Sequence, residues 1–215
     1  LLAINQHLAH PPRPMSLGMS DDTHHDKRAE FWRRHYERGR DYAGYLAAAE
    51  PARAERWRAL EARLPPVDAA MAARLSPVPR RVHILVYSGV WCGDCVRQGP
   101  MIQKLAEACP DAPVRFVERD QSVELQEELR VMGALRVPVV VFLSEDFWAL
   151  GRFGDRMLTS YRSKAQRELG AACDTGLVPA PGTELAAEMG EWLDIFERML
   201  LMARLSPPLR ARHGD

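Results

Sequence analysis

The chain has 215 residues, of which 47% are hydrophobic, and this is enough for one domain with an ordinary buried core. Basic and acidic residues number 29 each, so the net charge gives no electrostatic reason to expect nucleic acid or an anionic membrane as a partner. Four cysteines are too few for the disulfide framework of a small secreted protein, and no apolar run reaches the length of a membrane span. These features predict a cytoplasmic globular protein.

Residues 1–25 hold several histidines and prolines and no clear periodicity. We expect this stretch to be disordered or foreign to the natural chain, whose first residue would then be Met15 or Met19. It contains no basic leader, long apolar segment or small-residue cleavage pattern, so the sequence predicts neither a signal peptide nor a membrane anchor.

Residues 26–80 are predicted to be a helical extension that packs on the unit after it. Aromatic residues crowd its first part, and Trp57, Leu60 and Leu64 form an apolar stripe along a helix expected over 52–64. Aromatic stripes at helical spacing are typical of core packing. The starts and ends of these helices are marked by Gly39, Pro51, Pro65, Pro66 and the helix-capping Asp68.

Residues 81–169 alternate apolar strands with helices, which predicts an α/β unit. The expected strands cover 82–87, 114–118 and 139–143, and an extended segment over 147–154 follows a short turn. The expected helices begin near Cys92, at Val123 and at Asp155, and they end near 106, 132 and 169.

Residues 170–215 are predicted to be a loop, one helix and a frayed tail. The loop carries Cys173, and the helix over 183–205 presents an apolar face that contains Trp192 and Phe196. Pro207-Pro208 is expected to end that helix.

The most informative motif is Trp-Cys-Gly-Asp-Cys at 91–95, between the first apolar strand and a predicted helix. The thiolate is the reactive form of cysteine, and the free N–H groups and partial positive charge of a helix N-terminus stabilise it. Cys92 is expected at that N-terminus, and Cys95 one turn later on the same side. Two sulfurs so placed can close a disulfide and reopen it, so the motif indicates a redox dithiol.

Half of a zinc site is an alternative, because zinc sites also use C-x-x-C pairs. Zinc needs two more ligands, whereas Cys109 stands alone and the sequence holds no second C-x-x-C pair. The sequence therefore favours redox chemistry and predicts no metal or other cofactor.

Over residues 81–169 the chain resembles the thioredoxin superfamily. The resemblance implies a thioredoxin-like α/β/α sandwich with a mixed central sheet, to which this chain adds helical extensions at both termini. The variant Trp-Cys-x-Asp-Cys also resembles a group of bacterial thioredoxin-like proteins. Besides the dithiol, the residues that carry the resemblance are Pro100, Asp120, Val137, Pro138 and Gly154.

The resemblance implies a thiol–disulfide oxidoreductase, in which Cys92 attacks a substrate disulfide and Cys95 resolves the mixed disulfide. Trp91, Gly93 and the backbone of Val137-Pro138 would frame the substrate, with the proline in the cis form. The expected partners are a disulfide-containing protein or a small thiol substrate, and a reductant that the sequence does not identify. The alternative is a thioredoxin-like binding or adaptor protein whose dithiol is idle or regulatory.

Two positions depart from the thioredoxin pattern. Val86 stands where thioredoxins carry a buried aspartate that helps to move the proton of the second cysteine. Asp94 stands at the third position of the motif, where thioredoxins have proline, and its carboxylate opposes a second negative charge on the sulfurs. Two roles are open for Asp94: it accepts the proton of Cys95, directly or through water, or it is a solvated residue of the first helical turn.

Overall fold

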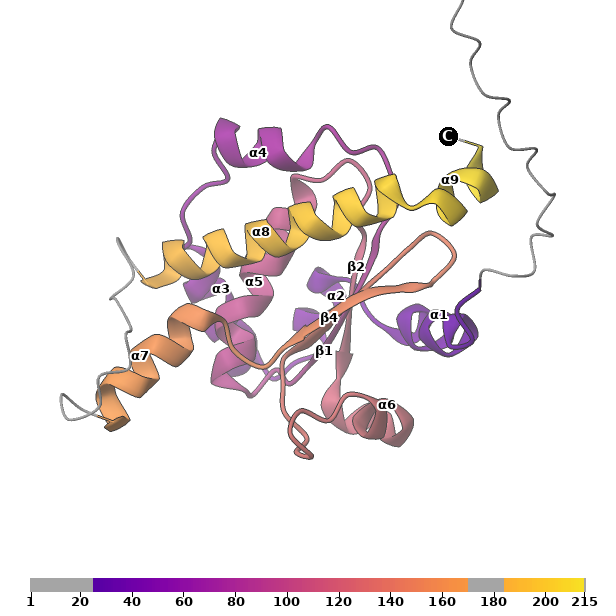
Figure 1. Ribbon diagram of the computed structural model, residues 1–215. Coiled ribbons are helices and arrows are strands. Elements are labelled where there is room, and N and C mark those ends of the chain that lie inside the picture. The colour runs from indigo at the N-terminus through magenta and orange to yellow at the C-terminus, as the bar shows by residue number, and fades with distance from the viewer. Residues whose placement is uncertain (1–24, 170–183, 215) are drawn as a thin grey trace, which may run out of the picture.

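The computed structural model describes residues 25–169 and 184–214 (Figure 1). Its sheet has the strand order β2-β1-β3-β4. The strands are β1 (His83–Ser88), β2 (Val114–Glu118), β3 (Val139–Leu143) and β4 (Ala149–Gly154). Strand β1 pairs in parallel with β2 and antiparallel with β3, and β3 and β4 form an antiparallel hairpin. This mixed sheet flanked by helices confirms the thioredoxin-like α/β fold that the sequence predicts.

Helices precede, connect and follow the strands of the described part. Those before β1 are α1 (Ala29–Arg38), α2 (Tyr42–Ala47), α3 (Pro51–Glu61) and α4 (Ala69–Leu75). The connecting helices are α5 (Gly93–Glu107), the 3-10 turn η2 (Arg119–Gln121) and α6 (Val123–Glu128). Those after β4 are α7 (Leu158–Leu169), α8 (Glu184–Leu205) and α9 (Pro207–His213).

One face of the sheet is covered by α2, α3, α5 and α8. Because side chains alternate along a strand, Val86 and Ser88 of β1 share this face with Phe116 and Glu118, their partners in β2. The ring of Phe116 stacks on Tyr45 of α2 at a centroid distance of 5.2 Å. This face therefore brings residues of the N-terminal helices next to the end of β1 that leads into the dithiol.

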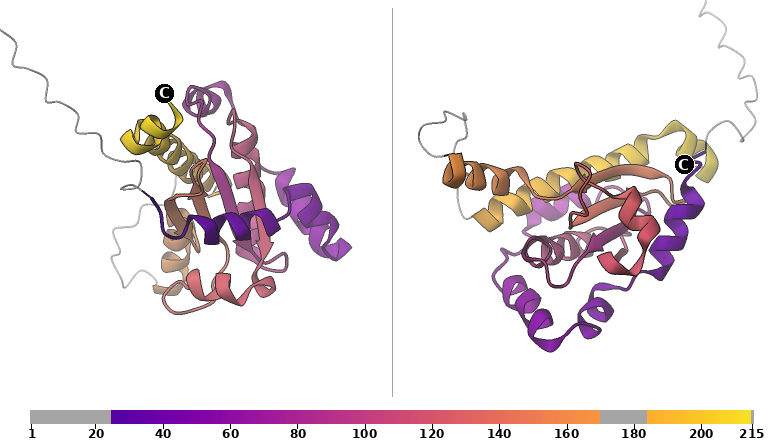
Figure 2. Two further views of the ribbon diagram at one scale, coloured as in Figure 1. Left: turned by 90° about the vertical axis from the view of Figure 1, so that its right-hand side faces the viewer. Right: turned by 90° about the horizontal axis from the view of Figure 1, so that it is seen from below.

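The opposite face of the sheet carries α1, which crosses it in the left view of Figure 2. Here Tyr36 of α1 packs edge-on against His83 of β1, with ring centroids 4.8 Å apart. The Tyr36 hydroxyl also donates a hydrogen bond of 3.0 Å to the carbonyl of Pro113, just before β2. The N-terminal helices thus pack against both faces of the sheet.

The contact between α3 and α5 is close enough to exclude any side chain at one position of α5. A Cβ atom added at Gly99 would lie 2.1 Å from Cζ3 of Trp57. Trp57 is completely buried there, and its Nε1 donates a hydrogen bond of 3.0 Å to the carbonyl of Val90 in the loop before the dithiol. The helical extension is therefore packed directly on the helix that carries the two cysteines.

Two predictions about helix ends are wrong. The helix expected to reach 132 ends at Glu128, because Leu129 already leaves the helical conformation (φ −103°, ψ 21°). Met132 and Gly133 then adopt left-handed conformations (φ 51° and 76°), which a right-handed helix cannot include. Residues after Ser206 form the short helix α9 in place of a frayed tail, since proline is well suited to the first turn of a helix. Cys173 and residues 1–24 lie outside the described residues.

None of the helices in 25–169 and 184–214 is long and apolar enough to cross a membrane.

Candidate active site

Cys92 follows the loop after β1 and is the N-cap residue of α5. Its backbone is extended, and the helix begins at Gly93. Cys95, three residues later, lies on the same side of the first turn. The side chain of Cys92 is half-buried, whereas Cys95 is completely buried, so the two sulfurs differ in their access to a substrate.

The surroundings of Cys92 lower the pKa of its thiol to about 6. The largest cause is a hydrogen bond from the Cys95 side chain, and the backbone N–H groups of Cys95 and Asp94 at the start of α5 add to it. Partial burial and the negative charge of Asp94 act in the opposite direction without reversing the shift. Cys92 is therefore a thiolate near neutral pH, which is the nucleophilic form.

The environment of Cys95 has the opposite effect. Burial, followed by the hydrogen bond and the charge of Cys92, raises the pKa of this thiol well above its usual range. The N–H group of Gly89 points at its sulfur from a distance of 3.3 Å. Cys95 therefore keeps its proton in the resting protein and must lose it before it can act as a nucleophile.

The cis peptide bond between Val137 and Pro138 lies directly beside the dithiol. The Sγ atom of Cys92 is 3.6 Å from the carbonyl oxygen of Val137, and both Val137 and Pro138 are buried. Trp91 is 37% exposed. Its ring lies 4.6 Å from the guanidinium carbon of Arg119.

At Gly93 an added Cβ atom would meet nothing within 4 Å, so the start of α5 is open. The exposed rim of the site is thus made of Trp91, Gly93 and the sulfur of Cys92.

Asp94 does not point freely into water. Its carboxylate forms an ion pair of 2.7 Å with Arg156, which follows β4. Asp94 thus lies in the first turn of α5 with its carboxylate paired to a guanidinium group, and both roles considered for it stay predictions.

Sequence reasoning missed a group of polar residues behind the buried sulfur. Tyr45 of α2 donates a hydrogen bond of 2.5 Å to Oε2 of Glu118, at the end of β2. The same oxygen accepts a hydrogen bond of 3.1 Å from the N–H group of Val90. Ser88 is completely buried beside Glu118 in the strand register. Only Ser88 left a signal in the sequence, as a polar residue on the core face of β1 two positions after Val86.

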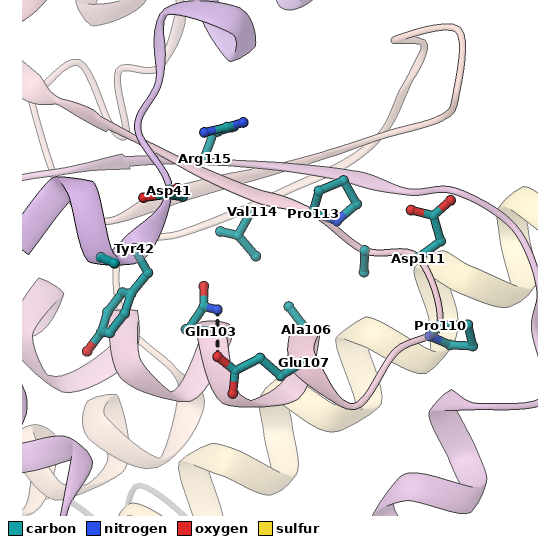
Figure 3. A pocket seen from close by; sticks show the side chains of 12 residues that line it. Asp41, Tyr42, Gln103, Ala106, Glu107, Pro110, Asp111, Pro113, Val114 and Arg115 are labelled. Carbon is teal, nitrogen blue, oxygen red and sulfur yellow. Dashed lines mark hydrogen bonds between the residues drawn. The ribbon is translucent and has the colours of Figure 1, made fainter.

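Two pockets border this part of the molecule. One of about 250 Å³ is lined by Tyr45, Val90 and Glu118 among others. A second, of about 500 Å³, lies between the start of α2, the C-terminal half of α5 and the start of β2, with Tyr42 at one end and Asp111 at the other (Figure 3). Neither cysteine of the dithiol lines either of these two pockets.

The other described cysteine, Cys109, is buried, and burial raises the pKa of its thiol to about 12. Its sulfur contacts the carbonyl of Leu105 in the preceding helical turn, as expected for a packed side chain. Within the part of the chain that the structure describes, no group of three or more His, Cys, Asp or Glu side chains could hold a metal ion.

Among solved structures, the chain is similar to a protein of unknown function from Pseudomonas aeruginosa, with 23% identity and a TM-score of 0.56 over 75% of this chain and 94% of that one. It is also similar to an HIV epitope-scaffold protein, with 19% identity and a TM-score of 0.52 over 85% of this chain and 98% of that one. At these identities the likeness concerns the fold alone. No curated protein matches the sequence.

A protein-family model described as thioredoxin matches residues 39–159, which is more than half of the 215 residues. The matched segment contains α2, α3, the whole sheet, the dithiol at the start of α5, and the cis-proline turn. Family match, sheet topology and dithiol placement agree, and the chain belongs to the thioredoxin family.

Proposed function

We propose that this protein is a thiol–disulfide oxidoreductase in which Cys92 is the attacking residue and Cys95 the resolving residue. The opposite pKa shifts of the two thiols, Cys92 lowered to about 6 and Cys95 raised, are the observation that carries the proposal. An accessible thiolate and a buried thiol one helical turn apart are what the two steps of thiol–disulfide exchange require.

In the first step the Cys92 thiolate attacks one sulfur of a substrate disulfide. A mixed disulfide forms, and the other substrate sulfur leaves as a thiolate that takes a proton from water. In the second step Cys95 loses its proton and attacks Cys92. The bond between Cys92 and the substrate breaks, the second substrate sulfur leaves, and the Cys92–Cys95 disulfide remains. The substrate gains two electrons and the dithiol loses two.

The rim of the site supports binding of an extended substrate beside Cys92. The Val137 carbonyl 3.6 Å from the Cys92 sulfur offers a backbone acceptor, and Trp91 offers an exposed aromatic surface. We propose that a disulfide-containing protein or a small disulfide is the substrate, and that a cellular reductant restores the dithiol in a reducing compartment such as the cytoplasm.

A redox titration of the dithiol, paired with reduction of the aromatic disulfide 5,5′-dithiobis(2-nitrobenzoate), tests this function. We expect a two-electron transition of the wild-type protein and rapid release of the first equivalent of thionitrobenzoate. A wild-type protein whose Cys92 is inert to this reagent and to alkylation would instead favour a binding or adaptor role.

A further inference from the structure

A line of polar groups leads from the buried sulfur toward the surface, behind the dithiol. It starts at Cys95, passes Ser88 at the end of β1, and reaches the hydrogen-bonded pair of Tyr45 and Glu118. Ser88 is 0% exposed, and its hydroxyl oxygen has no partner at full hydrogen-bond geometry. Burying a hydroxyl without a hydrogen-bond partner costs free energy, and Ser88 does so between two groups that keep their protons, Cys95 and Tyr45.

The Ser88 side chain interacts with both Cys95 and Tyr45. Burial raises the pKa of Cys95 and of Tyr45, and the Ser88 side chain partly offsets both shifts. Tyr45 therefore stays neutral, and its hydroxyl donates to Glu118. The donors can all point one way, from Cys95 to Ser88, from Ser88 to Tyr45, and from Tyr45 to Glu118.

We propose, on the basis of the oxidoreductase function above, that Ser88, Tyr45 and Glu118 form a proton relay that takes the proton of Cys95 during resolution of the mixed disulfide. Ser88 contacts the reacting thiol, whereas Tyr45 and Glu118 act through it. The relay lies on the same face of β1 as Val86, which has no acidic side chain. Its carboxylate is that of Glu118, which is reached through Tyr45 of the N-terminal extension.

The state of Cys92 decides when the relay operates. In the resting dithiol the Cys95 thiol donates its hydrogen bond to Cys92. Once Cys92 is part of a mixed disulfide it is no longer a charged acceptor, and the Ser88 hydroxyl, which also interacts with Cys95, takes its place. The proton of Cys95 passes to Ser88 Oγ, the Ser88 proton passes to Tyr45 Oη, and the Tyr45 proton passes to Glu118 Oε2. The Cys95 thiolate then attacks Cys92 and releases the substrate thiolate.

The end of the relay is open to solvent. Glu118 is only partly buried, and the pocket of about 250 Å³ borders both Glu118 and Tyr45. The accepted proton can therefore leave to water before the next turnover. The titratable and charged groups that face Glu118 are Tyr45, Arg119 and, around the pocket, Arg40, Glu50 and Arg53. Those that face Cys95 are Cys92, Tyr45 and Tyr87.

The test separates the two steps with 5,5′-dithiobis(2-nitrobenzoate) in a stopped-flow instrument. The first equivalent of thionitrobenzoate reports attack by Cys92, and the second reports resolution by Cys95. We expect Tyr45→Phe, Glu118→Gln and Ser88→Ala to slow the second release at least about tenfold near neutral pH and to leave the first unchanged. The difference from wild type should vanish at high pH, where hydroxide removes the proton directly, and Glu118→Asp should restore part of the rate.

Tyr42→Phe is the matched control, because Tyr42 lies on the same helix and also donates to a glutamate, Glu61, at 3.0 Å. It lines the other pocket and should leave both releases unchanged. A second release in Tyr45→Phe and Glu118→Gln that equals this control at every pH would overturn the relay, as would a slowing that is the same at every pH. Absence of the first release in wild type would instead refute the oxidoreductase function itself. Thermal unfolding of each variant shows whether it is folded.

Discussion

The two sulfurs of the dithiol lie in opposite environments although three positions separate them in the sequence. On the outer side, Cys92 is half-buried and meets N–H groups of the first helical turn and the carbonyl of Val137. On the inner side, Cys95 is completely buried behind the end of β1. Contacts within the motif and at the helix start lower the pKa of Cys92, whereas burial raises that of Cys95, so the two thiols of one motif differ in acidity.

The two sides also differ in where their residues come from. The outer side is built mainly from the motif and the adjacent helix start. The inner side joins Tyr45 and Glu118, which are 73 positions apart in the sequence. Local structure is thus enough to activate Cys92, whereas the surroundings of Cys95 depend on how the N-terminal helices pack.

The largest expected effect comes from exchanging the two cysteines for serine one at a time. We expect Cys92→Ser to abolish disulfide reduction, because the accessible thiolate is lost. Cys95→Ser should attack substrates but fail to resolve them, so mixed disulfides accumulate and can be detected by mass spectrometry. Accumulation in Cys92→Ser and not in Cys95→Ser would reverse the assignment of the two sides.

The free energies of unfolding of two alanine variants compare the inner side, where Trp57 lies, with the outer side, where Trp91 lies. Trp57 is completely buried and donates a hydrogen bond to Val90, so Trp57→Ala should lower the free energy of unfolding by about 3–5 kcal/mol. Trp91 is 37% exposed, so Trp91→Ala should cost less than about 1 kcal/mol and should raise KM for a disulfide substrate. Urea unfolding measures both, and equal losses would contradict the difference in burial.

The pH dependence of Cys92 alkylation tests how far Cys95 sets the pKa of Cys92. Because the pKa of Cys92 is lowered to about 6, its alkylation rate should fall as the pH drops through that value and should level off above it. Cys95→Ala removes the main hydrogen-bond donor, so the midpoint should move to higher pH, toward that of an ordinary thiol. Cys95→Ser keeps a donor and should move it less. Equal midpoints in the two variants would show that Cys95 does not set the pKa of Cys92.

Asp94→Asn should have the smallest effect. Removing this negative charge should lower the midpoint of Cys92 alkylation by less than about one pH unit, because Arg156 already balances part of the charge. The rate of resolution by Cys95 should stay unchanged if the proton leaves through Ser88. A strong slowing of resolution in Asp94→Asn would favour Asp94 as the proton acceptor.

Part of the site could be read from the sequence because it depends on neighbours in the chain. A strand followed by Trp-Cys-x-x-Cys and a helix places Cys92 at a helix start, and the resemblance placed the cis bond at Val137-Pro138. The partner of Asp94 could not be read in this way. Arg156 reaches that carboxylate only because the end of β4 lies beside the start of α5, and sequence spacing carries no such information.

The sequence by itself determined the dithiol, the strands and the family, since periodicity, glycine and proline positions and motif spacing act over a few residues. The tertiary structure decided the chemistry of the buried side. Two contacts join segments that are far apart in the chain: the hydrogen bond of Tyr45 to Glu118 and the packing of Trp57 against Gly99. These long-range contacts form because folding buries the whole core, and the free energy of that burial cannot be read from a sequence pattern of a few residues.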